Sequence, residues 1–368
     1  MWQRRAFLKA AGAGFAATLL PQRAEALAAA ELIFASVIQQ SASRYGAALL
    51  TDTGKLIAEI DLPGRGHDVV FSPALGRAVV FARQPGTFAV AFDPVGRAPT
   101  QTISSVEGRH FFGHGAFSGD ARLLYATEND FENARGVIGI YDVGAGYKRI
   151  GEFDTFGIGP HEMLMMPDEK IFVVANGGIE THPDYGRQEL NIDTMDPSLS
   201  FIDVATGDLL GQLRLSGELH QLSIRHLAVD RHGRVWFGCQ FRGDAEDRPQ
   251  LVGYATLEGE IRLIELPDDT LGSLRNYVGS VAASADGRLI GVSSPEGDAI
   301  LAINVDTTRT FDLIDLKGGC GIAPDSSGFV VSSGPGDLMG FAGSQTSERR
   351  FDFGFDNHLR VVDLSKLT

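Results

Sequence analysis

The chain has 368 residues, of which 43% are hydrophobic and 21% are charged, so it can bury a large core and is not a disordered or low-complexity protein. Its formal net charge of −15 makes nucleic acids and anionic membrane surfaces poor partners, whereas cations or a basic protein are favoured. Glycine is in excess, with 45 residues, or about 12% against a usual ~7%. This excess indicates many tight turns between short elements, and it favours an all-β fold.

Residues 1–26 have the layout of an export signal. A basic segment that contains Arg4 and Arg5 precedes a mildly apolar run over residues 10–20 and a small-residue stretch that ends at Ala26. The apolar run is too short to span a bilayer. Paired arginines followed by Phe-Leu-Lys resemble a twin-arginine signal, with a general secretory signal or an uncleaved anchor as alternatives. We therefore expect a periplasmic protein exported by the twin-arginine route, with no membrane span after signal removal.

Residues 27–368 contain a repeated pattern of short apolar runs separated by glycine-rich or polar corners. Seven repeats divide these 342 residues into units of about 49, and a four-stranded propeller blade usually takes ~40–50 residues. The sequence predicts a single seven-bladed β-propeller domain over 27–368. Outer-strand material near residues 31–37 and an inner-strand run over 359–364 predict closure by pairing of the two ends. Two packed sandwich domains are the alternative.

The longest interruption of the repeat is residues 176–198, in the third unit. Loops that interrupt a blade usually lie over one face of a propeller, where binding sites form. We expect this insertion to cover such a face, and a plain surface excursion is the alternative.

Five of the nine histidines fall at the start of a predicted inner strand: His67, His114, His161, His226 and His358. The first three are spaced 47 residues apart, and Ser280 and Cys320 take the corresponding place in the two other repeats. The starts of inner strands converge at one mouth of a propeller channel. A ring of imidazoles and a thiol predicts a transition-metal site, with iron or copper as the metal.

Two observations leave other interpretations of these histidines open. Counted from the turn that follows each strand, His67 and His161 lie one residue out of register, and one residue reverses a side chain in a strand. Histidine also follows glycine at Gly66 and Gly113, as in propellers whose Gly-His pairs form structural hydrogen bonds within a blade. A structural role for the histidines is therefore the alternative to a metal ring.

Other side chains near the strand starts are candidates for auxiliary roles. Glu162 could ligate a metal or orient an imidazole. Arg109 and Arg225 could attract an anion, and His182 could close over the ring from the insertion. The only cysteines are Cys239 and Cys320, and they could form a disulfide in an oxidising compartment, or be a buried thiol and a metal ligand respectively.

Several sequence motifs of known chemistry are missing. The chain has no haem-attachment motif, no phosphate-binding or dinucleotide-binding loop, and no G-x-S-x-G elbow. Catalysis is therefore not assigned. A non-catalytic scaffold that presents an acidic face to a protein partner and, less favoured, a lactonase-like hydrolase are alternatives to metal binding.

Six segments together resemble a family of twin-arginine-exported periplasmic proteins of uncharacterised function with a seven-bladed propeller of the YVTN type. They are residues 109–118, 126–130, 159–162, 176–191, 225–228 and 356–359. Genes for such proteins often neighbour imelysin-like proteins and a dihaem-type oxidoreductase. The resemblance implies a role in periplasmic iron or redox-metal acquisition with iron-handling partners, and it assigns no activity. We expect a monomeric or weakly associating protein that serves metal uptake or handling. The propeller of nitrous-oxide reductase is similar in gathering histidines at its axis to hold copper, but this chain lacks that enzyme's second copper domain.

Overall fold

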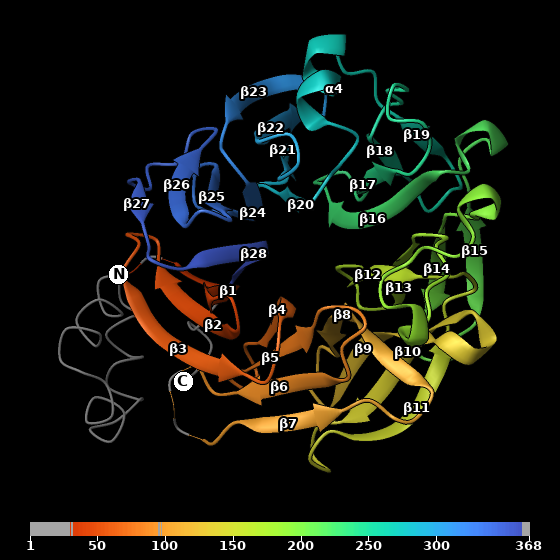
Figure 1. The fold of residues 1–368 in the computed structure, drawn as a ribbon, viewed down its shortest axis with the longest axis vertical. Helices are drawn as coiled ribbons and strands as arrows, with labels where there is room; N and C mark the ends of the chain where they lie inside the picture. Colours follow the sequence, from red (N-terminus) through yellow and green to blue (C-terminus); the bar gives the residue numbers. More distant parts are fainter. Residues whose placement is uncertain (1–29, 31, 95, 97, 363–368) are drawn as a thin grey trace.

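The structure is a computed structural model of the chain, and it describes residues 30, 32–94, 96 and 98–362. Seven four-stranded antiparallel sheets surround a central axis (Figure 1), which confirms the predicted all-β, seven-bladed propeller. The predicted signal at residues 1–26 lies outside the described residues. In the described part of the chain, no helix combines the length and the hydrophobicity needed to cross a membrane.

The strands of each blade are ordered from the axis outward (Figure 1). The innermost strands are β28 (Gly354–Val361), β4 (Gly66–Ser72), β8 (Arg109–Phe117), β12 (Pro160–Met165), β16 (Leu222–Val229), β20 (Ser280–Ala283) and β24 (Gly319–Pro324). The second strands are β1 (Ile33–Ser41), β5 (Arg77–Ala82), β9 (Leu123–Asp130), β13 (Ile171–Asn176), β17 (Val235–Phe241), β21 (Leu289–Ser294) and β25 (Phe329–Ser333).

The third strands are β2 (Arg44–Thr51), β6 (Phe88–Phe92), β10 (Arg135–Asp142), β14 (Ser198–Asp203), β18 (Val252–Ala255), β22 (Ala299–Asn304) and β26 (Asp337–Phe341). The outermost strands are β3 (Leu56–Leu62), β7 (Gln101–Ser104), β11 (Lys148–Asp154), β15 (Leu209–Leu213), β19 (Ile261–Leu263), β23 (Arg309–Asp315) and β27 (Arg349–Arg350). Short helices lie in the connections: η1 (Phe131–Asn133), η2 (Pro183–Tyr185), η3 (Ile192–Thr194), η4 (Gly217–Leu219) and α4 (Asp268–Leu274).

The ring of blades is closed by the two ends of the described chain. β28 pairs antiparallel with β1, with Val361 opposite Phe34 and Phe355 opposite Ile38. The predicted closure is therefore confirmed, although β1 is the second strand of its blade and not an outer one. Closure removes the exposed strand edges that an open sheet would leave at this point.

Burial follows the position of a strand in its blade. The second and third strands are covered on both faces by neighbouring blades, so β5 is buried from Ala78 to Ala82. The outermost strand β23 instead alternates between exposed and half-buried residues, because one of its faces meets solvent. The hydrophobic core therefore lies between the sheets and leaves the axis to polar side chains.

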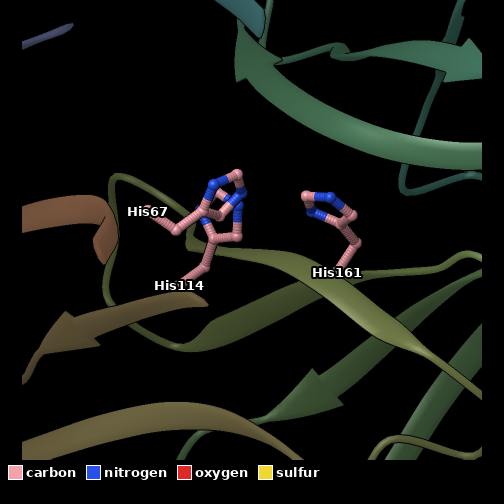
Figure 2. Close-up of side chains that lie close together, drawn as sticks. All are labelled: His67, His114 and His161. Atoms are coloured by element: carbon pink, nitrogen blue, oxygen red, sulfur yellow. The ribbon is translucent and has the colours of Figure 1, made fainter. Parts of the chain in front are cut away.

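β-Bulges at the starts of the inner strands place the histidines. His67 is the extra, unpaired residue of β4, and His161 is the extra residue of β12. A bulge redirects a side chain at the cost of one residue of register. The one-residue offset of these two histidines in the sequence therefore corresponds to bulges that redirect both side chains. Figure 2 shows the side chains of His67, His114 and His161 lying close together.

Candidate metal centre

Five buried imidazoles meet at the propeller axis, one from each of β28, β4, β8, β12 and β16. Their ring centroids lie 4.7 Å apart for the pairs His67–His358, His114–His358 and His161–His226, and 6.1 Å apart for His114–His226. The bare backbone of Gly113 permits this packing, because a Cβ atom there would lie 2.4 Å from Cδ2 of His67. The histidines that recur at the starts of the inner strands in the sequence therefore form one cluster in space.

Carboxylates fix the orientation of two of these rings. Nδ1 of His114 donates to Oδ2 of Asp68 over 2.9 Å, and Nδ1 of His226 donates to Oε2 of Glu162 over 3.1 Å. In both cases the carboxylate comes from the preceding blade. Because an ionised carboxylate only accepts hydrogen bonds, each ring carries its proton on Nδ1 and leaves the lone pair of Nε2 free. Neither Nε2 atom has a hydrogen-bond partner among the described residues.

The other three imidazoles also present a buried nitrogen without a hydrogen-bond partner in the described part of the chain. His358 has its Nδ1 3.3 Å from Oγ of Ser280 and leaves Nε2 unpartnered. Nδ1 of His67 lies 3.6 Å from Oδ1 of Asp356, longer than a hydrogen bond, and Nδ1 of His161 is unpartnered. An unpaired buried polar atom costs about 1–3 kcal/mol, so five of them in one cluster require an explanation.

Arg360 joins the two orienting carboxylates below the imidazoles. Its Nη2 atom donates to Asp68 at 2.6 Å and to Glu162 at 2.8 Å, and its Nε donates to Asp68 at 2.8 Å. Burial alone would raise the pKa of Glu162, but the charge of Arg360 and the bond from His226 lower it to about 2. Burial alone would also raise the pKa of Asp68. The charge of Arg360 and the hydrogen bond from His114 outweigh this effect, so the pKa of Asp68 is lowered. Both groups are therefore carboxylates at neutral pH.

Burial favours the neutral form of His67, His161, His226 and His358. It lowers the pKa of His67 to about 3 and lowers the pKa values of His161 and His358 well below the usual value. The pKa of His226 is lowered as well, because burial outweighs the attraction of Glu162. Neutral imidazole is the form that ligates metals.

The ligand atoms of the histidines are close enough to act together. Two overlapping sets, His67/His114/His161 and His114/His226/His358, each bring three ligand atoms within 4.8 Å of one another. Figure 2 shows the first set, with His67 and His114 next to each other and His161 beside them. In the second set all three unpartnered atoms are Nε2, and each ring is held through Nδ1.

Cys320 does not join this cluster. Its Sγ atom points to backbone carbonyls, 3.2 Å from that of Asp356 and 3.5 Å from that of Ser332. Burial, together with the nearby Asp356 carboxylate, raises the pKa of this thiol to about 12, so a thiolate ligand is disfavoured. Cys239 is also a free buried thiol, and the disulfide considered from the sequence is not formed.

The auxiliary candidates separate into two groups. Glu162 and Ser280 contact the ring, and Arg225 lines a cavity at the channel mouth with His67 and His161. Arg109 instead pairs with Asp130 at 2.8 Å. His182 lies in the insertion 3.6 Å from Glu132 and does not line that cavity, although its neighbours Ile179 and Thr181 do.

Sequence reasoning missed two residues that hold the ring, Asp68 and Arg360, and a carboxylate close to His67, Asp356. A signal for the first was present, because Asp68 follows His67 just as Glu162 follows His161. Nothing local marks Arg360, whose two carboxylate partners lie 292 and 198 residues away in the sequence.

Comparisons with known proteins agree with the fold and leave the site unassigned. The model of a family described as "Protein of unknown function (DUF1513)" matches residues 60–362. No curated protein sequence matches the chain. Among solved structures, hydrazine synthase of Kuenenia stuttgartiensis is similar with a TM-score of 0.58 at 13% identity, over 81% of this chain and 91% of that one. At that identity the likeness concerns the fold alone.

Proposed function

The chain belongs to the DUF1513 family, and we propose that it is a metal-binding propeller that holds one transition-metal ion through Nε2 of His114, His226 and His358. The observation that carries the proposal is the set of five buried, unpartnered imidazole nitrogens gathered at the axis. A bound cation would give these nitrogen atoms a partner, whereas the hydrogen bonds within the protein leave them unpaired.

The partners of the three proposed ligands support the same conclusion. Histidines that bind metals usually donate their other ring proton to a carboxylate or another acceptor, which fixes the tautomer and raises ligand basicity. Asp68 and Glu162 do this for His114 and His226, and Ser280 contacts Nδ1 of His358. Arg360 holds both carboxylates in place and offsets one of their two negative charges.

The donor set narrows the choice of ion. Imidazole suits zinc, copper, iron and nickel, and hard ions such as magnesium or calcium prefer oxygen ligands. We propose iron or copper, with His67 and His161 as further nitrogen donors on the mouth side. The bound ion would supply either redox chemistry or a site from which metal is passed on.

We further propose that this centre serves metal uptake or handling in the periplasm. The basic, apolar and small-residue order of residues 1–26 supports export, and the acidic chain favours the approach of cations. The resemblance to proteins encoded beside imelysin-like proteins suggests iron-handling partners.

Metal titration of purified protein tests the proposal. Wild-type protein, stripped with the uncharged chelator 1,10-phenanthroline, is expected to bind one Fe(II) or Cu(II) per chain. The variant His226→Ala is expected to lose that binding. The matched control His220→Ala removes a half-buried imidazole outside the ring, which is hydrogen-bonded to the carbonyl of Gly217, and it should bind like the wild type. Negligible binding to the wild type, or equal binding by both variants, would reject the proposal.

A further inference from the structure

The mouth of the channel above the histidines is a small cavity with four arginines in its wall. It has a volume of about 250 Å³, and His67 and His161 form part of its lining. The arginines are Arg83, Arg187, Arg225 and Arg242. They come from separate segments of the chain: the end of β5, the insertion after β13, β16 and the loop after β17.

The charges of these arginines are only partly balanced by the protein. Arg242 pairs with Glu189 at 3.1 Å, and Arg83 lies 3.4 Å from Asp356. Arg225 donates to the uncharged Oγ of Ser223 at 2.9 Å. Within the described ranges, neither Arg187 nor Arg225 has a carboxylate at ion-pair distance. The wall also contains the carboxylates of Glu189 and Glu296, so four guanidinium groups share the cavity with two carboxylates and positive charge is in excess there.

Gathering these cations in one place is unfavourable without a ligand. Partial desolvation by the surrounding protein and the charge of Arg83 lower the pKa of Arg187, although its side chain stays open to solvent. The chain as a whole carries a charge of −15, so a cluster of cations at the axis is not a consequence of composition. Guanidinium forks match carboxylate and phosphate oxygens, and they are favoured where such anions are recognised.

We propose that this cavity binds a small oxyanion with at least two negative charges, a polycarboxylate or a phosphate, between Arg187 and Arg225. The volume is below the range typical of drug-sized ligands, so the anion is small. Thr181, Gln240 and Tyr277 also line the cavity and offer hydrogen bonds to further oxygens of the ligand. The anion would contact His67 and His161, and under the proposed metal function it would lie next to the ion.

Calorimetric titration of metal-free protein tests the anion site apart from the metal site. The protein is stripped with 1,10-phenanthroline, which carries no carboxylate, and is titrated with citrate, phosphate or chloride at constant ionic strength. We expect saturable binding of one citrate or one phosphate, and none of chloride. Preference for citrate would identify a polycarboxylate site, and preference for phosphate would identify a phosphate site.

Charge-removing variants locate the site. Arg225→Gln and Arg187→Gln should each weaken anion binding roughly tenfold to a hundredfold, as expected for a lost charge-assisted hydrogen bond. Arg309→Gln removes from the outer strand β23 an exposed charge that has no ion-pair partner in the part of the chain that the structure describes, and it should leave the affinity unchanged. Arg187 is exposed, so its variant should fold even if the Arg225 variant does not.

The results that overturn the anion site differ from those that overturn the metal site. Binding of neither citrate nor phosphate by wild-type protein rejects the anion site. An equal loss in Arg309→Gln, or unchanged affinity in a folded Arg187→Gln variant, also rejects it. The variant His226→Ala should keep its anion affinity, because the titration uses metal-free protein. A metal titration that shows no binding would therefore not affect the measured anion affinity.

Discussion

Replacing Glu162 by glutamine isolates the part played by the carboxylate that orients His226. Glu162 is buried and accepts from Nδ1 of His226 at 3.1 Å, from the backbone N–H of Leu227 at 3.3 Å and from Nη2 of Arg360 at 2.8 Å. Glutamine has nearly the same shape but only one accepting oxygen, and its amide group donates. In Glu162→Gln, therefore, either His226 or Arg360 faces another donor.

The expected magnitude follows from these contacts. Hydrogen bonds to charged groups contribute about 1.5–3 kcal/mol each, and removing one partner of a buried ion pair costs about 3–5 kcal/mol. Arg360 keeps its contacts to Asp68, so we expect the metal-free protein to lose ~3 kcal/mol of stability, at the low end of the ion-pair range. Loss of the orienting carboxylate should also weaken metal binding about 10- to 100-fold.

Glu128→Gln is the matched control for this variant. Glu128 is also buried, and it accepts from Tyr141 Oη at 2.5 Å and from Arg149 Nη2 at 2.9 Å. Its partners lie on β10 and β11, the outer strands of its blade, so it does not touch the histidine ring. Glu128→Gln should cost a similar amount of stability and leave metal affinity unchanged.

Urea denaturation of metal-free protein and competitive metal titration measure the two effects separately. The account predicts that both variants lose stability and that only Glu162→Gln loses metal affinity. Equal metal affinity of Glu162→Gln and the wild type would refute the assignment of Glu162 as an orienting partner. A similar affinity loss in both variants would show that the effect is general destabilisation.

Three further predictions concern acid, thiols and metal removal. Burial lowers the pKa values of His67, His161, His226 and His358, so below about pH 6.5 the unfolded chain gains protons that the folded protein does not. Metal-free protein should therefore lose stability as the pH falls from 6.5 to 4.5, by up to about 1.4 kcal/mol per pH unit for each such histidine. Urea titrations over this pH range measure the loss, and a free energy of unfolding that does not fall would contradict the burial of neutral imidazoles. Cys239 and Cys320 are free and buried, so in the absence of reductant Ellman's reagent should detect two thiols in denatured protein and none in folded protein. A melting temperature that falls when dithiothreitol is added would contradict the assignment of free thiols. Removing the metal should lower stability by about 2.7 kcal/mol relative to protein with free metal at 100 times its Kd, and His358→Ala should abolish that difference in thermal melts.

The sequence predicts the architecture well because a propeller repeats its signals. Each blade contributes similar strand and turn patterns, and seven weak patterns at a constant spacing identify one fold. The same repetition marks the histidines, since His67, His114 and His161 lie 47 residues apart. What the repeat does not contain is the bulge, an irregularity of pairing that decides whether His67 and His161 face the axis.

The supporting residues of the site are harder to predict because their contacts join distant blades. Arg360 reaches Asp68 and Glu162 across the closed ring, and no spacing in the sequence predicts this. For Cys320 the sequence predicts a contact with the ring that the structure does not contain. It occupies the position of a ring histidine in its repeat, but its shorter side chain turns to the carbonyl of Asp356 and packs in a core cluster with Phe34 and Phe355.

A crystal structure of metal-loaded protein with anomalous scattering recorded at the absorption edge of the metal tests the central claim most directly. The account predicts one anomalous peak on the propeller axis at about 2.0–2.1 Å from Nε2 of His114, His226 and His358. A peak elsewhere, or no peak at the axis in protein that binds metal in solution, would contradict it.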